Sequence, residues 1–149
     1  MQRILFILLF SAIVSNANGI KNIKSCSEGD SEACNRIGTF FEHGIETKQN
    51  LTKAKLYYNK ACTLGHGAAC SRLAQILKQE EDYQNASKYY FAGCRFNHAD
   101  ACCDLASLFR AGKGVKTDYK QAKQYYKKAC SLGDKSSCEH YAYFDRNGI

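Results

Sequence analysis

The 149-residue sequence contains no proline. Proline breaks helices because it lacks a backbone N–H and its ring clashes with the preceding turn. Its absence, together with 11 glycines, favours an all-α chain with glycine-based turns.

The sequence also lacks an apolar run long enough to cross a bilayer, which takes about 20 residues. The longest run, from Ile4 to Val14, follows Arg3 and precedes small residues that include Ser15 and Ala17. This pattern predicts a signal peptide over residues 1–19, cleaved at about 17–19, and no membrane span. We therefore expect a secreted or periplasmic protein.

The four histidines, His43, His66, His98 and His140, are scattered along the chain and form no cluster. The spacing of the cysteines, described below, is not that of zinc ligands. We therefore predict no metal site and no cofactor.

The charge balance is mildly basic. Removal of Arg3 with the signal peptide leaves 20 basic and 14 acidic residues, a net charge of +6. Such a balance can favour anionic polysaccharides or membrane surfaces. The alternative is ordinary solubilisation of helix surfaces, which we favour because the lysines lie among acidic and polar neighbours. We expect no nucleic-acid partner.

Eight of the nine cysteines form four pairs with identical C-x7-C spacing, and the pairs recur at steps of 36, 32 and 36 residues. These steps are in the range of solenoids built from helix pairs. The pairs are Cys26 and Cys34, Cys62 and Cys70, Cys94 and Cys102, Cys130 and Cys138.

Each pair must span a chain reversal if it forms a disulfide. Eight residues of helix cover about 12 Å, whereas a disulfide joins Cα atoms at most about 7 Å apart. Gly or Asn lies between the cysteines of every pair, at Gly29, Gly65, Asn97 and Gly133, and these residues favour the left-handed helix cap. We therefore predict four disulfides, each joining the end of one helix to the start of the next. Export would provide the oxidising environment that they need.

The helix after each pair has apolar residues at its third and sixth places and a small residue at its fourth. The third-place residues are Ile37, Leu73, Leu105 and Tyr141. This spacing is helical, and the small residue lets a neighbouring helix approach closely. The helix before each of the last three pairs carries adjacent tyrosines, which are suited to stacking on bases or sugars. At a fixed repeat position we interpret them as core residues with polar tips.

A longer pattern identifies the repeat: Leu105-x3-Phe109-x2-Gly112-x-Gly114-Val115-x2-Asp118-x2-Gln121-Ala122-x2-Tyr125-Tyr126-x2-Ala129-Cys130-x2-Gly133. It resembles the Sel1-like repeat, a relative of the tetratricopeptide repeat. With its cysteine pairs and predicted signal peptide, the chain resembles the Helicobacter cysteine-rich protein family of secreted Sel1-repeat proteins. The resemblance implies a disulfide-stapled, right-handed α/α solenoid.

We expect one repeat domain over residues 20–149, with units at about 30–65, 66–97, 98–133 and a partial unit at 134–149. These units predict seven helices, the last a lone helix over about 134–146. The first unit has Glu46 and Thr47 where Gly and Val are usual, and the second unit lacks four loop residues. We therefore expect the loops to differ in shape.

The resemblance implies two functions. Family members are described as penicillin-binding proteins with β-lactamase activity, and the repeat class serves as an interaction scaffold. The Ser-x-x-Lys, Ser-Asp-Asn and Lys-Thr-Gly elements of a serine β-lactamase are absent from the sequence. The nearest match, Thr117 to Lys120, lies at a helix start, where Thr117 or Asp118 is better explained as an N-cap. A scaffold for a host protein or cell-wall fragment is therefore the alternative, and a signalling role is neither supported nor excluded.

Recognition is expected on the first helix of each pair, where polar positions vary between repeats while core positions do not. When the repeats are aligned on the second cysteine of each pair, each set of equivalent residues forms a column. The three variable columns are Asn35, Ser71, Cys103 and Glu139; Arg36, Arg72, Asp104 and His140; Thr39, Gln75, Ser107 and Tyr143. Our candidate binding residues are Arg36, Thr39, Arg72, Gln75, Asp104, Ser107 and His140. Arg36 and Arg72 would lie roughly 20 Å apart for helices packed at about 10 Å. Arginine suits the carboxylates of a β-lactam, a peptidoglycan fragment or an extended acidic peptide.

Cys103 is the unpaired cysteine. Its repeat counterparts are polar, so we expect it to point away from the core and to be free for a mixed disulfide or a covalent dimer. The alternative is a partly buried, inert thiol.

Overall fold

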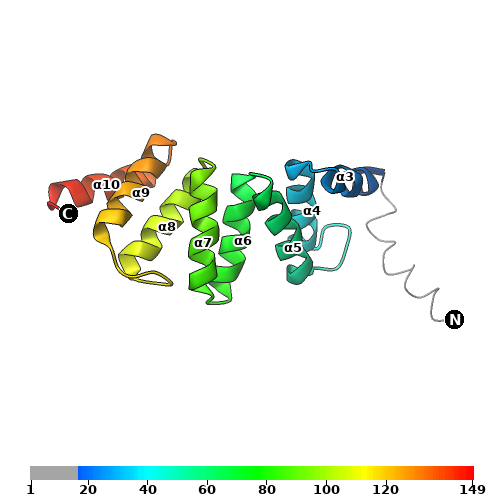
Figure 1. Ribbon diagram of the computed structural model, residues 1–149, viewed down its shortest axis with the longest axis horizontal. Coiled ribbons are helices and arrows are strands. Elements are labelled where there is room, and N and C mark those ends of the chain that lie inside the picture. The colour runs from blue at the N-terminus through cyan, green and yellow to red at the C-terminus, as the bar shows by residue number, and fades with distance from the viewer. Residues whose placement is uncertain (1–16) are drawn as a thin grey trace. The chain divides into compact units, whose positions relative to one another are not determined.

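The computed structural model describes residues 17–149, which form two compact units, residues 17–64 and residues 65–149. All regular elements in this part of the chain are α-helices (Figure 1). The all-α prediction is confirmed. The predicted signal peptide lies mostly outside the described residues.

The first unit contains α3 (Ala17–Ser27), α4 (Ser31–His43) and α5 (Leu51–Thr63). The second contains α6 (Gly67–Gln79), α7 (Tyr83–Arg95), α8 (Ala99–Ala111), α9 (Tyr119–Ser131) and α10 (Lys135–Arg146). Within each unit, each helix packs on the next along the chain. The expected count of seven helices is wrong, because α3, which carries the first cysteine of the first pair, is an additional helix and the described residues hold eight.

Polar residues cap the N-termini of most of these helices, because their side chains accept a hydrogen bond from a backbone N–H in the first turn. Asp118 accepts from the N–H of Gln121 at 2.9 Å, so Asp118, and not Thr117, is the N-cap of α9. At the start of α6, Nδ1 of His66 accepts from the N–H of Ala69 at 3.1 Å. His98 holds the same place before α8 without such a bond. The two turn histidines are therefore cap residues of their helices.

Disulfides join the end of one helix to the start of the next, as predicted. The Cα atoms of Cys26 and Cys34 are 4.7 Å apart. The Cα distance is 4.6 Å for Cys94 and Cys102 and 4.6 Å for Cys130 and Cys138. Cys62 and Cys70 are each in a disulfide as well. The turn residues between these cysteines all have positive φ: Gly29, Gly65, Asn97 and Gly133.

The expectation that the inter-helix loops differ in shape is wrong for the loops after α4 and α8. Gly44 and Glu46 have φ of 68° and 56°, and Gly112 and Gly114 have φ of 66° and 70°. In both loops a backbone N–H near the loop end bonds back to the preceding helix. Glu46 therefore adopts the left-handed conformation that glycine holds in the other loop, at an energetic cost.

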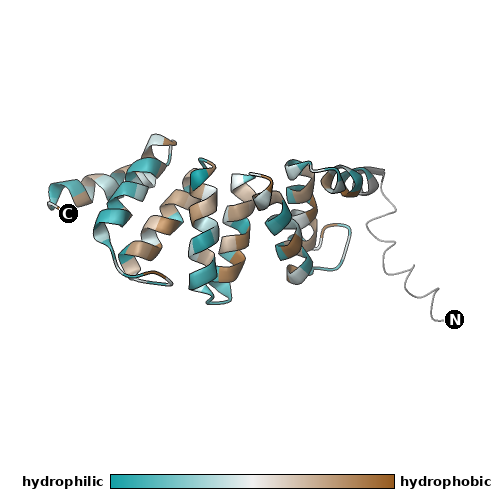
Figure 2. Ribbon diagram, in the orientation of Figure 1, coloured by the Kyte–Doolittle hydropathy of each residue, from teal (hydrophilic) through white to brown (hydrophobic). Residues whose placement is uncertain are grey.

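The core residues occupy equivalent positions in successive repeats. Ile37, Leu73 and Leu105 are at most 3% exposed, whereas their counterpart Tyr141 on the last helix is only half-buried. The second tyrosine of each pair, Tyr58, Tyr90 or Tyr126, is fully buried, which confirms its prediction as a core residue. In the second unit, α6 and α8 are the more hydrophobic helices, and α7 and α9 expose hydrophilic faces (Figure 2).

Candidate functional site

The buried tyrosines carry their hydroxyl groups to the polar columns of the neighbouring helix. The Tyr58 hydroxyl donates to Oε2 of Glu42 at 2.5 Å and lies 3.2 Å from Oγ1 of Thr39. In the second unit, the Tyr126 hydroxyl lies 3.1 Å from Oγ of Ser107. The predicted site residues Thr39 and Ser107 are therefore positioned by the core below them.

Tyr90 differs from its two counterparts. Its hydroxyl is buried and has no hydrogen-bond partner within the described chain. Burial raises the pKa of the Tyr90 phenol above its ordinary value, and the nearby Asp104 carboxylate raises that pKa further. The phenol is therefore neutral at physiological pH, and Lys78 lies over its ring, with Nζ 5.6 Å from the centroid.

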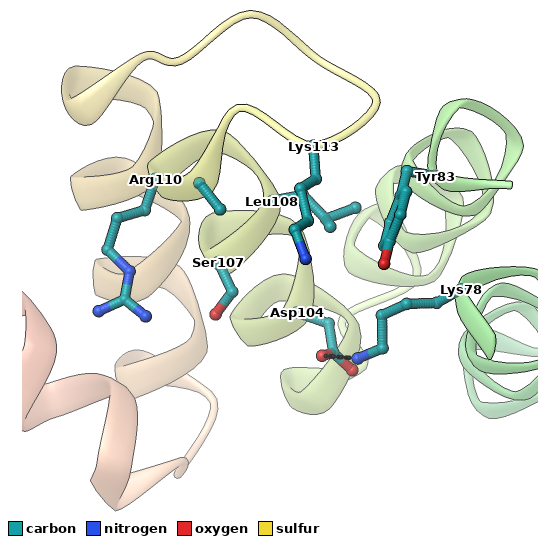
Figure 3. Close-up of a pocket in the computed structure, with 8 residues that line it drawn as sticks. Lys78, Tyr83, Asp104, Ser107, Leu108, Arg110 and Lys113 are labelled. Carbon is teal, nitrogen blue, oxygen red and sulfur yellow. Dashed lines mark hydrogen bonds and ion pairs between the residues drawn. The ribbon is translucent and has the colours of Figure 1, made fainter. Parts of the chain in front are cut away.

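A pocket of about 360 Å³ opens beside these groups in the second unit. Its lining comes from α6, the start of α7, α8 and the loop after α8: Lys78, Tyr83, Asp104, Ser107, Leu108, Arg110, Ala111 and Lys113. Lys78 and Tyr83 face Asp104 and Leu108 across the opening, with Lys113 above them (Figure 3). A volume of this size is in the range of small ligand sites.

Cationic groups outnumber acids in this pocket by three to one. Nζ of Lys78 forms an ion pair with Oδ1 of Asp104 at 2.9 Å. Nζ of Lys113 lies 5.0 Å from the centroid of the Tyr83 ring. Neither Arg110 nor Lys113 has an acidic partner among residues 17–149. The pocket therefore has unneutralised positive charge at its edge.

The loop that carries Lys113 is fixed by close backbone contact. A Cβ at Gly114 would overlap the backbone of Tyr83 and Gln84, and Gly114 has a φ of 70°. Only glycine satisfies both conditions without strain. Gly114 thus holds Lys113 over the Tyr83 ring.

The structure brings two of the seven candidate residues, Asp104 and Ser107, into this pocket. Arg36 lies elsewhere, exposed on α4, where its guanidinium pairs with Glu32 at 3.5 Å. Arg72 and Gln75 lie on α6, exposed and half-exposed respectively. His140 is half-buried, with its ring 4.7 Å from the ring of Tyr126, so it also has a packing role.

The first variable column is not a uniform recognition surface. Ser71 is 2% exposed, and its hydroxyl has no hydrogen-bond partner in the described chain. Cys103 packs half-buried against the apolar clusters around Leu105 and Phe144. The expectation that Cys103 points away from the core is therefore wrong, although it is a free cysteine as predicted. The neighbouring helices α9 and α10 cover this part of α8, which the polarity of the column does not reveal.

Cys103 should react slowly. Burial raises the pKa of its thiol, the nearby Ser137 side chain lowers the pKa by less than burial raises it, and the charges of Asp134 and Asp104 raise it further. Because the thiolate is the nucleophile, we expect iodoacetamide at mildly alkaline pH to modify Cys103 much more slowly in the folded chain than in urea. Mass spectrometry over a time course measures both rates, and equal rates would contradict the burial. Folding raises the pKa of the Cys103 thiol above its value in the unfolded chain. The contribution of the protonated thiol to the free energy of unfolding is therefore fully present below the unfolded-state pKa, and it is lost as pH rises through the folded-state pKa.

Four pocket residues, Lys78, Tyr83, Arg110 and Lys113, were not among the predicted site residues. Lys78 and Arg110 belong to a further variable column, with Glu42 and Arg146, one turn beyond Thr39 and Ser107. Extending the column comparison by one turn would have found these two. Lys113 occupies a loop position whose direction depends on the contact at Gly114 and could not be read from spacing.

Within residues 17–149 there is no group of three or more His, Cys, Asp or Glu side chains suited to holding a metal ion. No helix in this part of the chain has the length and hydrophobicity needed to cross a bilayer.

Comparisons with known proteins agree with the repeat pattern. The Sel1 repeat model matches residues 31–66 and 99–134, and a tetratricopeptide repeat model matches residues 67–91. A search of curated proteins by sequence finds no significant match.

Twenty-two solved chains are similar to this chain, among them the following three. A Sel1 repeat protein from Oxalobacter formigenes is 20% identical, with a TM-score of 0.75 over 83% of this chain and 96% of its own. Cysteine-rich protein B from Helicobacter pylori is 29% identical, with a TM-score of 0.62 over 83% of this chain and 96% of its own. A protective antigen of uropathogenic Escherichia coli is 21% identical, with a TM-score of 0.77 over 88% of this chain. This chain spans only 29% of that antigen.

Proposed function

We propose that this chain, which belongs to the family of disulfide-rich Sel1-repeat proteins, is an interaction scaffold that binds an extended acidic segment of a partner protein. The observation that carries the proposal is the cationic pocket of the second unit. Arg110 and Lys113 have no acidic partner there, so a carboxylate-bearing ligand would neutralise them. Charge-assisted hydrogen bonds of this kind contribute about 1.5–3 kcal/mol each when formed.

The shape of the site favours an extended chain over a compact ligand. The lining residues run along α8 from Asp104 to Ala111, about two helical turns, and continue to Lys113 in the loop after α8. The Lys78–Asp104 pair supplies a donor and an acceptor for a peptide backbone, and Leu108 and Tyr83 supply apolar contact. A peptide with acidic residues near one end, which would meet Arg110 and Lys113, would satisfy these groups together.

Hydrolysis of β-lactams, which the family resemblance implies, has less support. The Ser107 hydroxyl bonds to a phenol rather than to a base, and the ammonium of Lys78 pairs with Asp104. An activated serine needs an adjacent general base. Purified oxidised protein should therefore turn over nitrocefin no faster than the heat-denatured protein.

Export is part of the proposal. Disulfides persist in oxidising compartments and are rare in the cytosol, so the observed disulfides favour the exterior or the periplasm. The signal peptide over residues 1–19 and the repeat boundaries at 30–65, 66–97, 98–133 and 134–149 remain predictions. A Cys103-linked dimer is not favoured, because the thiol is half-buried.

The binding test uses a fluorescent extended peptide rich in Asp and Glu and its Asn and Gln counterpart. We expect the acidic peptide to bind more tightly, and Arg110→Gln with Lys113→Gln to weaken that binding at least tenfold, which corresponds to about 1.4 kcal/mol or more. Fluorescence polarisation at low and high salt measures both affinities. The matched control is Arg95→Gln with Lys135→Gln, which removes two exposed cations outside the pocket. Equal losses in the two double variants would contradict the assignment to this pocket.

A further inference from the structure

The second unit has a separate basic and aromatic surface, formed by the outward faces of α7 and α9. From Lys116 to Lys135 inclusive the sequence has six basic residues and two acidic ones, Asp118 and Asp134. Both acids are helix N-caps whose carboxylates accept backbone N–H groups, at 2.9 Å from Gln121 and 2.9 Å from Ser137. The positive charge of this segment is therefore only partly offset.

The basic residues of α9 share an exposed face. Lys120, Gln124 and Lys127 are all exposed and lie at the spacing of one helix face. α9 contains four lysines and no acidic residue. On α7, the residues at the equivalent repeat positions are Gln84, Lys88 and Phe91, which are also exposed. Equivalent positions on successive second helices of a repeat array point to the same side.

Phe91 is the unusual residue on this surface. It is 45% exposed, and its counterparts in the other repeats are the polar residues Asn59 and Lys127. The repeat therefore does not need an aromatic residue here for packing. Phe91 borders an apolar pocket of about 250 Å³, lined by Ser87, Lys88, Phe91, Leu105, Phe109 and Val115.

This pocket adjoins α9. The ring of Tyr125, on α9, stacks on Phe109 with the centroids 5.6 Å apart and the planes inclined by 12°. An exposed aromatic side chain next to an apolar hollow and flanked by lysines is the arrangement of a protein face that sits in the interfacial region of a bilayer. A soluble polyanion would use the lysines and leave Phe91 in water.

We propose that the outward face of α7 and α9 binds an anionic phospholipid surface. Phe91 enters the interfacial layer, and Lys88, Lys120 and Lys127 contact the headgroups. The acidic-peptide pocket has a different lining, so the scaffold would hold its partner close to a membrane. Failure of this proposal would leave the peptide-binding proposal untouched, and the reverse also holds.

Phe91→Trp gives a local probe, because the chain contains no other tryptophan. A local probe is needed because the apolar run at residues 4–14 can itself attach the full chain to vesicles. We expect the fluorescence of oxidised full-length Phe91→Trp to shift to the blue with vesicles of equal parts phosphatidylglycerol and phosphatidylcholine. The shift should be lost in high salt, which screens exposed charges.

Adding Lys120→Gln with Lys127→Gln to the probe protein should raise the lipid concentration that gives half of the fluorescence shift about thirtyfold. Each lysine near an anionic surface contributes about 1 kcal/mol, and 1.4 kcal/mol is a factor of ten. The matched control is Lys53→Gln with Lys60→Gln, which have the same spacing on α5 and are also exposed. Thermal melting by circular dichroism confirms that each variant is folded. No shift with anionic vesicles, an equal shift with phosphatidylcholine alone, equal losses in both double variants, or a preference for a soluble acidic polysaccharide would each overturn the proposal.

Discussion

Replacing Cys94 and Cys102 together by alanine should lower the free energy of unfolding by about 2–3 kcal/mol and leave the far-ultraviolet circular dichroism nearly unchanged. The disulfide closes a ring of about nine residues, and loss of this constraint on the unfolded chain accounts for that magnitude in the chain-entropy model. Alanine is preferred to serine because both positions are at most 2% exposed. The helices remain because their packing does not depend on the bridge: Leu105, Ala101 and Tyr90 are buried in the same cluster.

The matched control for this experiment is Cys103→Ala, which changes the neighbouring residue without removing a bridge. Urea unfolding followed by circular dichroism should give a much smaller loss for this variant. A complete loss of helicity in the Cys94→Ala, Cys102→Ala protein would show that the disulfides create the fold and do not merely reinforce it.

Gly38→Ala should destabilise the first unit by about 1–3 kcal/mol, the usual range for overpacking a core. A Cβ at this position would lie 2.6 Å from two ring carbons of Tyr58. The ring cannot move aside easily, because it is fully buried and its hydroxyl is held by Glu42 and Thr39.

The sign of this effect makes the test decisive. In a helix interior, alanine is favoured over glycine by about 1 kcal/mol, so without the contact Gly38→Ala would stabilise the protein. Thermal melting by circular dichroism should show a lower midpoint. A raised midpoint would mean that α4 and α5 are not packed as closely as described.

Much of the fold could be predicted from the sequence because its signals are repeated. The spacing of the cysteine pairs, the small residue at the fourth place and the buried tyrosines each recur, so one coincidence cannot produce them. α3 was missed because it precedes the first complete repeat unit and has Cys26 but not the tyrosine pair of the other helices that end at a cysteine. The loop shape at Glu46 was wrong because a non-glycine residue can adopt positive φ where the surrounding hydrogen bonds require it.

The candidate site was less predictable. Column analysis identified Asp104 and Ser107, but the pocket also needs Lys78, Tyr83 and Lys113, which come from other elements and meet only in three dimensions. Burial of Ser71 and Cys103 depends on which helix covers them. A polar residue type does not reveal that cover, since the cover depends on where the neighbouring helix packs.

The most direct test of the account is a nuclear magnetic resonance titration of the isotope-labelled, oxidised protein with the acidic peptide. If the chain is a scaffold that binds through the cationic pocket, the backbone amide signals of Asp104 to Lys113 and of Lys78 and Tyr83 should shift in proportion to bound peptide. The amides around Phe91 and on the outward face of α9 should shift little. Shifts confined to other parts of the chain, or no shifts at peptide concentrations that saturate binding, would contradict the proposed function.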